Sequence, residues 1–455
     1  MSSSMISLAD IWSEFRRSKV GMLGLSILLL LMVLSVIALT TGTKVREWND
    51  PSVWSLYPRN AMPSWVNLFT DERLTEHLIL SDKDISVEQS RGVKQVKHTF
   101  TVDYIYDTLP TDIIMMYKVN YQGSALLQAS ITRPDGEVVE YARISLPSNM
   151  NKSLYESRLS SNDRVVQDTA SSILDRYNFP IERSDTLTPV FYSYDGEFVK
   201  GRYILTLTFF LFNADDEVVD TMIVIGGRVY GLLGTDELRR DLSIGVIWGA
   251  PLALFIGVSV ASISVMIGMI YGIVSGYKGG RIDEGMMRLN DVVYALPALP
   301  LLILLAVSIG RSVLLIVAYL IIFGWVGIAK VSRSITLQIK NLAYIEAAEL
   351  MGQSSMKIIL RHIFPQLLPY TFASIAISVP GAIITEAGLS FLGLGDPTMP
   401  TWGQILHDAN LYGAAARGLW WWIVPPGLMI SLTGLAFVLV GNALDAIVNP
   451  RMKRL

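Results

Sequence analysis

Few side chains in this 455-residue sequence have the type and spacing needed for covalent or metal chemistry. The sequence contains no cysteine, which excludes disulfides, thiolate zinc ligands and thiol nucleophiles. Its four histidines form no H-E-x-x-H zinc pattern, and no G-x-S-x-G nucleophile turn is present. A G-x-x-x-x-G-K-[ST] loop is also missing, so the chain has no P-loop of its own for ATP. We therefore expect no catalytic residue, no metal site and no bound cofactor.

The most distinctive spacing occurs in a polar segment, residues 342–365. Its first part predicts a short helix over 342–351, in which the small side chains of Ala347 and Ala348 let another surface approach closely. Gly352 follows at the position of a left-handed helix cap. The first part of this segment is therefore suited to close packing against the surface of another protein.

A second short helix is predicted after this turn. Ser354 or Ser355 can cap its first residue, and Pro365 comes where the helix should stop or kink. We expect two short helices at an angle to each other, between two membrane spans. A generic amphipathic loop is the alternative interpretation.

The elements that must position this segment are apolar. Hydrophobic residues make up 51% of the sequence and charged residues 17%, against about 25% charged in soluble domains. Six apolar runs can cross a hydrocarbon layer of about 30 Å as helices: residues 20–41, 242–277, 292–309, 313–329, 367–392 and 420–444. The first run is longer than the apolar core of a signal peptide, and no cleavage signal follows it. We expect an α-helical polytopic membrane protein.

The distribution of Lys and Arg predicts the orientation. With the N-terminus inside, the short cytoplasmic segments hold fourteen basic residues, whereas the short outer loops hold only Arg311 and Arg417. Both termini are therefore expected in the cytoplasm, and residues 42–241 on the extracellular or periplasmic side. Residues 1–19 are expected to form an amphipathic helix on the inner membrane surface. The basic residues form no patch for nucleic acid, so no nucleic-acid partner is expected.

Residues 42–233 are expected to form a mainly β extracellular domain between the first and second membrane helices. The predicted strands are 112–119, 125–132, 138–146, 203–212 and 218–225. Turn residues predict one hairpin around Pro134-Asp-Gly and a second between the last two strands. A helix is predicted over 163–177, with Ser160, Ser161 or Asn162 as its cap. We expect a β-sandwich-like fold that serves as a binding or docking module.

The segment 342–365 resembles the EAA loop of ABC-importer permeases, E-A-A-x3-G-x9-I-x-L-P. Glu346, Ala347, Ala348, Gly352 and Pro365 fall at the family spacing, while Ile363 is one place late and Phe364 replaces leucine. With Arg361, the run is similar to the dipeptide/oligopeptide branch and its C-type inner-membrane subunit. The resemblance implies an ATPase-coupling loop made by Tyr344, Glu346, Ala347, Ala348, Gly352, Arg361 and Pro365.

Three other segments are similar to the same branch. Residues 234–241 resemble its G-T-D-E-L-G-R-D, with Arg239 in place of the glycine. The next loop matches at Asp283, Arg288, Asp291 and Pro297, and residues 389–403 match most closely. The C-terminal segment 441–451 departs from the family pattern at its charged positions. The resemblance covers about 1–45 and 230–455 and implies that 234–455 is the permease core with five transmembrane helices.

Several residues within the spans are candidates for packing or for the pathway. Gly268, Gly272 and Gly276 form a G-x-x-x-G-x-x-x-G face, which favours close helix packing, with gating as the alternative. Glu386 near the outer end of the fifth span is a candidate for pathway lining or for a structural ion pair. Gly393 and Gly395 permit a non-helical segment at a pore mouth.

The resemblance implies a machine of several subunits. It requires a second homologous permease subunit, two ABC ATPase subunits that use ATP and Mg, and an extracellular solute-binding protein. Dipeptides or oligopeptides are the expected cargo, with oligosaccharides or nickel as alternatives. A membrane-anchored receptor or scaffold is a more remote interpretation, since it leaves the EAA loop and the five later spans unexplained.

Overall fold

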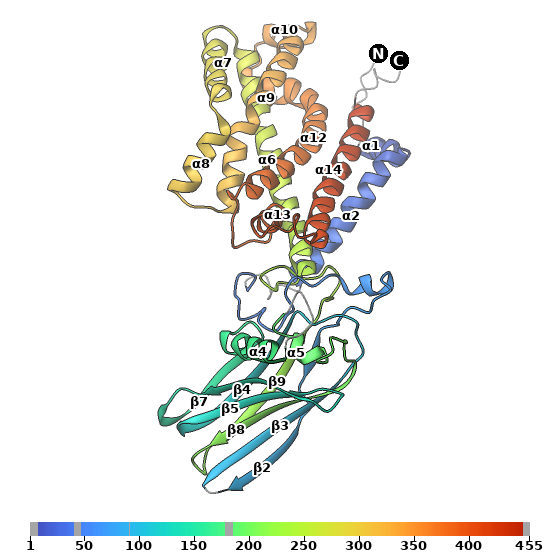
Figure 1. Ribbon diagram of the computed structural model, residues 1–455. Coiled ribbons are helices and arrows are strands. Elements are labelled where there is room, and N and C mark those ends of the chain that lie inside the picture. Colours follow the sequence, from blue (N-terminus) through green and yellow to red (C-terminus); the bar gives the residue numbers. More distant parts are fainter. Residues whose placement is uncertain (1–7, 41–46, 91, 178–184, 449–455) are drawn as a thin grey trace. The chain divides into compact units, whose positions relative to one another are not determined.

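The computed structural model describes residues 8–40, 47–90, 92–177 and 185–448. The chain divides into two compact units (Figure 1), one with residues 1–49 and 244–455 and one with residues 50–243. We call them the membrane unit and the β unit. Residues 450 and 451 of the C-terminal family pattern lie outside the described residues.

The membrane unit is built from helices. Their bounds are α1 Leu8–Phe15, α2 Lys19–Thr40, α6 Leu242–Lys278, α7 Gly280–Ala295, α8 Ala298–Ser308, α9 Val313–Lys340, α10 Ala343–Leu350, α11 Ser355–Ile358, the π-helical turn η2 Ile359–Ile363, α12 Phe364–Phe391, α13 Trp402–Leu411 and α14 Trp420–Val448. Among the residues that the structure describes, five helical segments are long and apolar enough to cross a membrane, or six if the bent pair α7–α8 forms one span. The predicted polytopic helical fold is confirmed.

The predicted span 292–309 is not one straight helix. It contains the end of α7 and all of α8, and these two helices are bent by 73° at the break between them. Leu296 is extended at the break, with ψ 134°. A proline restricts the residue before it to extended conformations, so Pro297 ends α7 inside an apolar run that hydropathy reads as continuous.

The helix after Gly352 does not stop at Pro365, which was one of the two outcomes expected there. It neither stops nor makes a separate element, because α11, η2 and α12 form a continuous helical segment from Ser355 to Phe391. Pro365 stands in the first turn of α12, directly after the π-helical turn. Proline has no backbone N–H to donate to the helical hydrogen bonds. The wider π-helical turn just before Pro365 changes which backbone groups are hydrogen-bonded there, so the helix continues beyond the proline.

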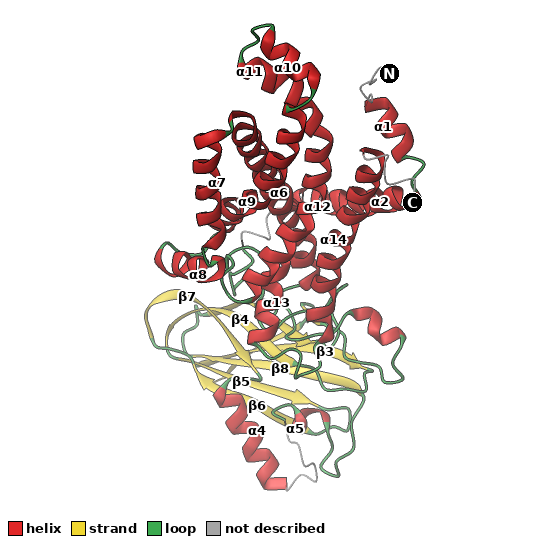
Figure 2. Cartoon of the chain, turned by 90° about the horizontal axis from the view of Figure 1, so that it is seen from above, coloured by secondary structure: helices red, strands yellow, loops and turns green. Residues whose placement is uncertain are grey.

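The β unit contains two antiparallel sheets (Figure 2). Their strands are β1 Leu78–Leu80, β2 Asp84–Ser90, β3 Val93–Tyr104, β4 Asp112–Gly123, β5 Ala125–Thr132, β6 Val138–Ser145, β7 Asn149–Ser160, β8 Gly201–Leu211 and β9 Glu217–Gly226, with helices η1 Ser64–Leu68, α4 Arg164–Tyr177 and α5 Thr188–Phe191. The sheet orders are β1-β9-β4-β7 and β2-β3-β8-β5-β6. Both sheets contribute side chains to one hydrophobic core, for example Met115 of β4 and Leu207 of β8, each 0% exposed. This is the layered arrangement of a β-sandwich.

One predicted hairpin is confirmed and the other is wrong. β5 and β6 pair across the Pro134-Asp-Gly turn, where Gly136 has φ +88°. β8 and β9 lie in different sheets, because β8 pairs with β3 and β5 whereas β9 pairs with β1 and β4. The chain crosses between the sheets at the buried Asp216, which accepts a hydrogen bond from Gln122 N of β4 (3.1 Å). Alternation predicts a strand but says nothing about its partner.

The predicted cap of α4 is displaced by one residue. The helix begins at Arg164, and the carbonyl of Asp163 accepts the first helical hydrogen bond, from Gln167 N (3.0 Å). Ser160 and Ser161 instead bind the buried carboxylate of Asp112. A hydroxyl near a helix start can therefore serve a tertiary contact that the sequence does not show.

Candidate coupling site

One face of α10 is buried inside the membrane unit. Ile345 is 0% exposed and Ala348 is 3% exposed. Both belong to a cluster with side chains of α6, α9 and the helical segment after Gly352, namely Met269, Ile273, Tyr277, Ile339, Ile358, Ile363 and Leu367. The family-motif residue Ala348 is thus a packing residue, since its small side chain lets α10 lie close to this cluster.

The opposite face of α10 is uncovered within the subunit. Glu346 and Ala347 are exposed there. Beyond them, Leu350 is 83% and Met351 74% exposed, and Tyr344 is 43% exposed. Large apolar side chains that cluster on a surface mark an interaction site. The two adjacent alanines therefore differ in their surroundings, since Ala348 faces the core and Ala347 is exposed.

The turn after α10 has the predicted conformation. Gly352 has φ +77°, and its N–H donates to Glu349 O (2.9 Å). Gln353 N donates to Ala348 O (3.1 Å). Ser354 occupies the cap position of α11, although its side chain makes no capping hydrogen bond. The left-handed region favours glycine, so this turn fixes where the chain leaves α10.

Polar contacts join α10 to the long helices. Tyr277 of α6 donates its hydroxyl proton to Glu349 Oε1 (2.9 Å), and Lys340 Nζ of α9 donates to Tyr277 O (2.7 Å). Gln366 of α12 donates to the hydroxyl of Tyr344. Arg361 and Pro365 are exposed on the following helical segment. Side-chain hydrogen bonds thus connect α10 to both α6 and α12.

A second polar network joins α6, α7 and α9. Arg333 binds Asp283 through two nitrogens, with Nε 2.5 Å from Oδ1, and Ser275 donates to the same carboxylate. Lys330 Nζ lies 2.8 Å from Asp291 Oδ1. The sequence comparison with the family marked the two aspartates but missed their basic partners on α9. The signal was the spacing of Lys330 and Arg333, which places both on one helix face.

The three glycines of α6 lie against α9. A Cβ at Gly268 would be 2.6 Å from Trp325 O, one at Gly272 would be 2.4 Å from Ala329 O, and one at Gly276 would be 2.8 Å from Arg333 O. All three distances are shorter than a real Cβ contact allows. This geometry supports the packing interpretation over gating.

Two further glycines of α6 were missed. A Cβ at Gly245 would be 2.5 Å from the ring of Trp48, and one at Gly249 would be 2.1 Å from Trp402 Nε1. The indole N–H of Trp402 donates to Val246 O (2.8 Å). The G-x-x-x-G spacing at 245–249 was the available signal, because residues four apart share a helix face.

The pathway candidates lie where α12 ends. Glu386 is 4% exposed and accepts a hydrogen bond from Ser390 Oγ (2.7 Å), and no cation pairs with it among the described residues. Gly393 has φ +80°, and its Cβ would be 2.9 Å from the His407 ring. A Cβ at Gly395 would be 2.3 Å from Ser390 Oγ. The glycines thus let the segment after α12 fold back closely, and Glu386 is enclosed within the subunit.

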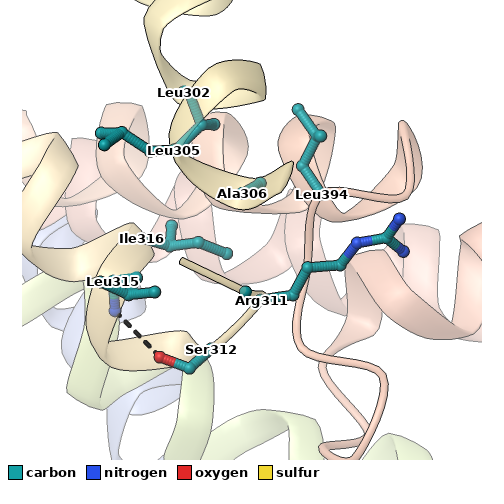
Figure 3. A pocket seen from close by; sticks show the side chains of 9 residues that line it. Leu302, Leu305, Ala306, Arg311, Ser312, Leu315, Ile316 and Leu394 are labelled. Atoms are coloured by element: carbon teal, nitrogen blue, oxygen red, sulfur yellow. Dashed lines mark hydrogen bonds between the residues drawn. The ribbon is translucent and has the colours of Figure 1, made fainter. Parts of the chain in front are cut away.

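An apolar pocket lies beside this segment (Figure 3). Its walls come from α8, from the first turn of α9 and from Leu394, and Ser312 Oγ caps α9 by accepting from Leu315 N (3.2 Å). The Arg311 side chain runs outward, away from the apolar walls (Figure 3). Arg311 and Ser312 are the polar residues of the lining, and Val313 N donates to Asp396 Oδ2 (3.3 Å), which joins the start of α9 to the segment after α12. No cluster of three or more metal-ligating side chains occurs in the described part of the chain.

These features define an integral membrane protein in which a short helix, α10, packs by one face against the long apolar helices and leaves its other face exposed. The family of binding-protein-dependent transport system inner membrane components matches residues 244–454. The dipeptide transport system permease protein DppC of Bacillus subtilis (strain 168) is 40% identical over 222 residues, which cover 49% of this chain and 69% of that protein. The oligopeptide transport system permease protein OppC of Haemophilus influenzae is 37% identical over 224 residues, 49% of this chain and 71% of that protein. An inward-facing structure of the MetNI methionine ABC transporter covers 45% of this chain and 95% of that chain, with 18% identity and a TM-score of 0.35.

The chain belongs to the binding-protein-dependent ABC transport permeases. It is a multi-pass protein of the inner membrane, and subunits of this class are not catalytic. Membership implies ATPase and solute-binding-protein partners. The family match begins at residue 244, so it says nothing about the β unit.

Proposed function

We propose that this chain forms half of the transmembrane pathway of an importer of dipeptides or oligopeptides. Dipeptide, di/tripeptide and oligopeptide transport permeases that are 34–40% identical to this chain support this cargo. The observation that carries the mechanism is the division of α10 into a buried face and an uncovered face. The uncovered face, with Glu346, Ala347 and Leu350, is the docking surface for an ATPase subunit.

The coupling follows from the contacts of α10. Two ABC ATPases bind ATP together with Mg and hydrolyse it, and this chain binds neither ATP nor Mg. When they close, the docked α10 is displaced, and its contacts with Tyr277 and Gln366 transmit the displacement to α6 and α12. A second homologous permease completes the pathway, and a solute-binding protein delivers the cargo from outside.

The proposed topology places residues 1–19 in the cytoplasm, 20–41 in the first span, 42–233 outside and 234–455 in the permease core. The excess of fourteen basic residues over two in the short loops supports this orientation. It puts α10 on the ATP side of the membrane. It puts the β unit on the side where the binding protein docks or where the pathway opens.

The docking surface is tested with Ala347→Arg in the assembled transporter. A long charged side chain at this exposed position is expected to abolish or strongly reduce ATPase co-purification and ATPase stimulation by a peptide-loaded binding protein. The matched control is Ala415→Arg, an exposed alanine between α13 and α14 on the outer side of the proposed topology, which should leave ATPase co-purification unchanged. Full stimulation in the Ala347→Arg protein would refute the docking role. Stimulation by a sugar-loaded protein alone would retain the coupling and change the cargo.

The role of the β unit is tested by removing its strands. The backbones at His77 and Gly227 are adjacent, since a Cβ at Gly227 would be 2.4 Å from His77 N. A short Gly-Ser linker can therefore replace residues 78–226, which include the nine strands of the described part of the chain. Uptake is expected to fall while ATPase association remains. Normal uptake after the replacement would contradict a role in docking the binding protein or shielding the entrance.

A further inference from the structure

Four large apolar side chains cluster on the surface of the β unit, in two loops far apart in sequence. Leu68 is 80% exposed and Phe69 81%, Trp65 is 40% exposed, and Leu232 is 65% exposed. Trp65 and Leu232 are in direct contact, because the indole N–H donates to Leu232 O (3.0 Å). We call these four residues the apolar tip. Single exposed apolar residues need no explanation, but a contiguous group of this size marks a binding surface.

The apolar tip is held in a defined shape. Ser64 N donates to Gly231 O (2.9 Å), which joins the two loops. Asn67 closes its own loop through two hydrogen bonds with the backbone of Leu74, at 3.0 and 3.1 Å. Residues three apart eclipse each other in a 3₁₀ helix, so η1 presents Trp65 and Leu68 on the same side. A surface that is already ordered loses little conformational entropy when it binds.

The loops that carry the apolar tip also hold the first residue of α6. Leu242 N donates to Gly234 O (3.0 Å), and Leu242 is 1% exposed. Thr235 Oγ1 accepts from Ala61 N (2.9 Å) and donates to Pro58 O (2.8 Å), so both loops are bound to the turn that precedes α6. The apolar tip and the entry of α6 are thus parts of one hydrogen-bonded cluster.

The length of α6 brings this cluster to the membrane surface. Its uncharged run starts at Leu242, directly after Asp241, and the helix has 37 residues. At 1.5 Å per residue it is about 55 Å long, against a bilayer of about 40–45 Å with its headgroup layers. With tilt, such a helix spans the hydrocarbon and both headgroup layers. The residues that hold Leu242 then lie at the headgroup level.

We infer that the apolar tip inserts into the interfacial layer of the bilayer and anchors the β unit to the membrane. Tryptophan is enriched at this depth, where an apolar ring and a satisfied N–H are both accommodated. The exposed charged residues Asp71, Glu72 and Arg73 follow directly and mark the side that stays in water. A lipid surface fits this arrangement better than a protein partner, because the loops that carry the apolar side chains are hydrogen-bonded to the turn that leads directly into α6.

The absence of cysteine makes the test direct. Single variants Leu68→Cys and Phe69→Cys are labelled with a nitroxide in the full chain, in phosphatidylcholine nanodiscs without partner proteins. Val138→Cys, on a strand and 61% exposed, is the water-exposed control. The labels at 68 and 69 are expected to relax strongly with oxygen and weakly with a water-soluble nickel chelate, and the label at 138 to show the reverse.

Equal access of nickel at positions 68, 69 and 138 would overturn the inference and would leave a protein partner as the occupant of the apolar tip. Because two positions are labelled, the failure of one variant to fold leaves the other to decide. The nanodisc contains no ATPase and no binding protein. A negative result therefore leaves the proposed transport function standing, and a failed coupling experiment leaves the membrane anchor standing.

Discussion

Arg239 holds an energetically costly backbone conformation in order to make a buried ion pair. It is one of two non-glycine residues with positive φ in the described chain, at +67°. Its Nη2 donates to Asp112 Oδ2 (2.7 Å), and its Nη1 donates to Tyr57 O (2.7 Å). Asp112 is 1% exposed on β4 and also accepts from Ser161 N (3.1 Å). The contact therefore ties the segment that leads into α6 to the β-sandwich.

The two effects can be separated with two substitutions. Either Arg239→Ala or Arg239→Gly removes the guanidinium and leaves a buried carboxylate without its charge partner, which costs about 3–5 kcal/mol. The Arg239 side chain is 17% exposed, so we expect the lower end, about 3 kcal/mol for alanine. The left-handed conformation costs a residue with a Cβ about 1–2 kcal/mol, and glycine avoids this cost. Arg239→Gly should therefore lose only about 1–2 kcal/mol.

Hydrogen exchange in the full-length subunit in nanodiscs measures both losses. The readout is the free energy of opening at Ser161 N, which binds Asp112, and at neighbouring amides of β4. The matched control is Arg202→Ala, since the Arg202–Asp103 pair is 70% and 65% exposed and is worth about 0–1 kcal/mol. A loss in the glycine variant equal to or larger than that in the alanine variant would refute the reasoning about backbone cost. Unchanged exchange in both would refute the ion pair's role.

Three further outcomes are expected. Gly272→Val should destabilise the α6–α9 contact by about 1–3 kcal/mol, because even a Cβ would lie 2.4 Å from a carbonyl oxygen of α9; an unchanged thermal midpoint in detergent would contradict this. Asp283→Asn should lower the same thermal midpoint, because the ion pair with Arg333 is partly buried and each charge-assisted hydrogen bond contributes about 1.5–3 kcal/mol. Equal midpoints in the two proteins would show that this ion pair does not contribute to stability. Burial, followed by the nearby Lys83, lowers the pKa of His98 from 6.5 to about 4. A depressed histidine pKa means that stability is fully present above pH 6.5 and is lost as the pH falls to about 4, in total about 3 kcal/mol. Urea unfolding of the β unit within the full chain should show this loss, and His98→Gln should flatten it; an identical slope in both proteins would exclude His98 as its source.

Much of the fold was predicted correctly from patterns among residues close together in sequence. The apolar runs were long enough to define membrane helices whatever their neighbours, because the bilayer acts on each helix separately. Gly352 was readable as a left-handed cap, since a helix end and a glycine are adjacent in sequence. The Pro134-Asp-Gly turn likewise joins strands that are neighbours in the chain. In each case all the interacting groups lie within a few residues of one another.

The errors came from features that depend on distant residues. β8 and β9 look like a hairpin, yet each strand pairs in its own sheet. The sequence also did not show that Glu386 is enclosed beside Ser390. Pro297 and Pro365 are chemically alike, but one ends a helix and the other is passed through a π turn. The outcome at each site depends on packing partners that a local pattern does not contain.

The sequence by itself determined that this is a polytopic membrane protein, the number of membrane helices to within one, and the position of the short helix α10. These follow from hydrophobic length and from short-range backbone preferences, which act without long-range contacts. Only the tertiary structure decided which face of α10 is free, which sheet each strand joins, and that Arg239 reaches Asp112 from 127 residues away. These outcomes depend on the free energy of burying groups against particular distant partners, and that free energy exists only once the chain has folded.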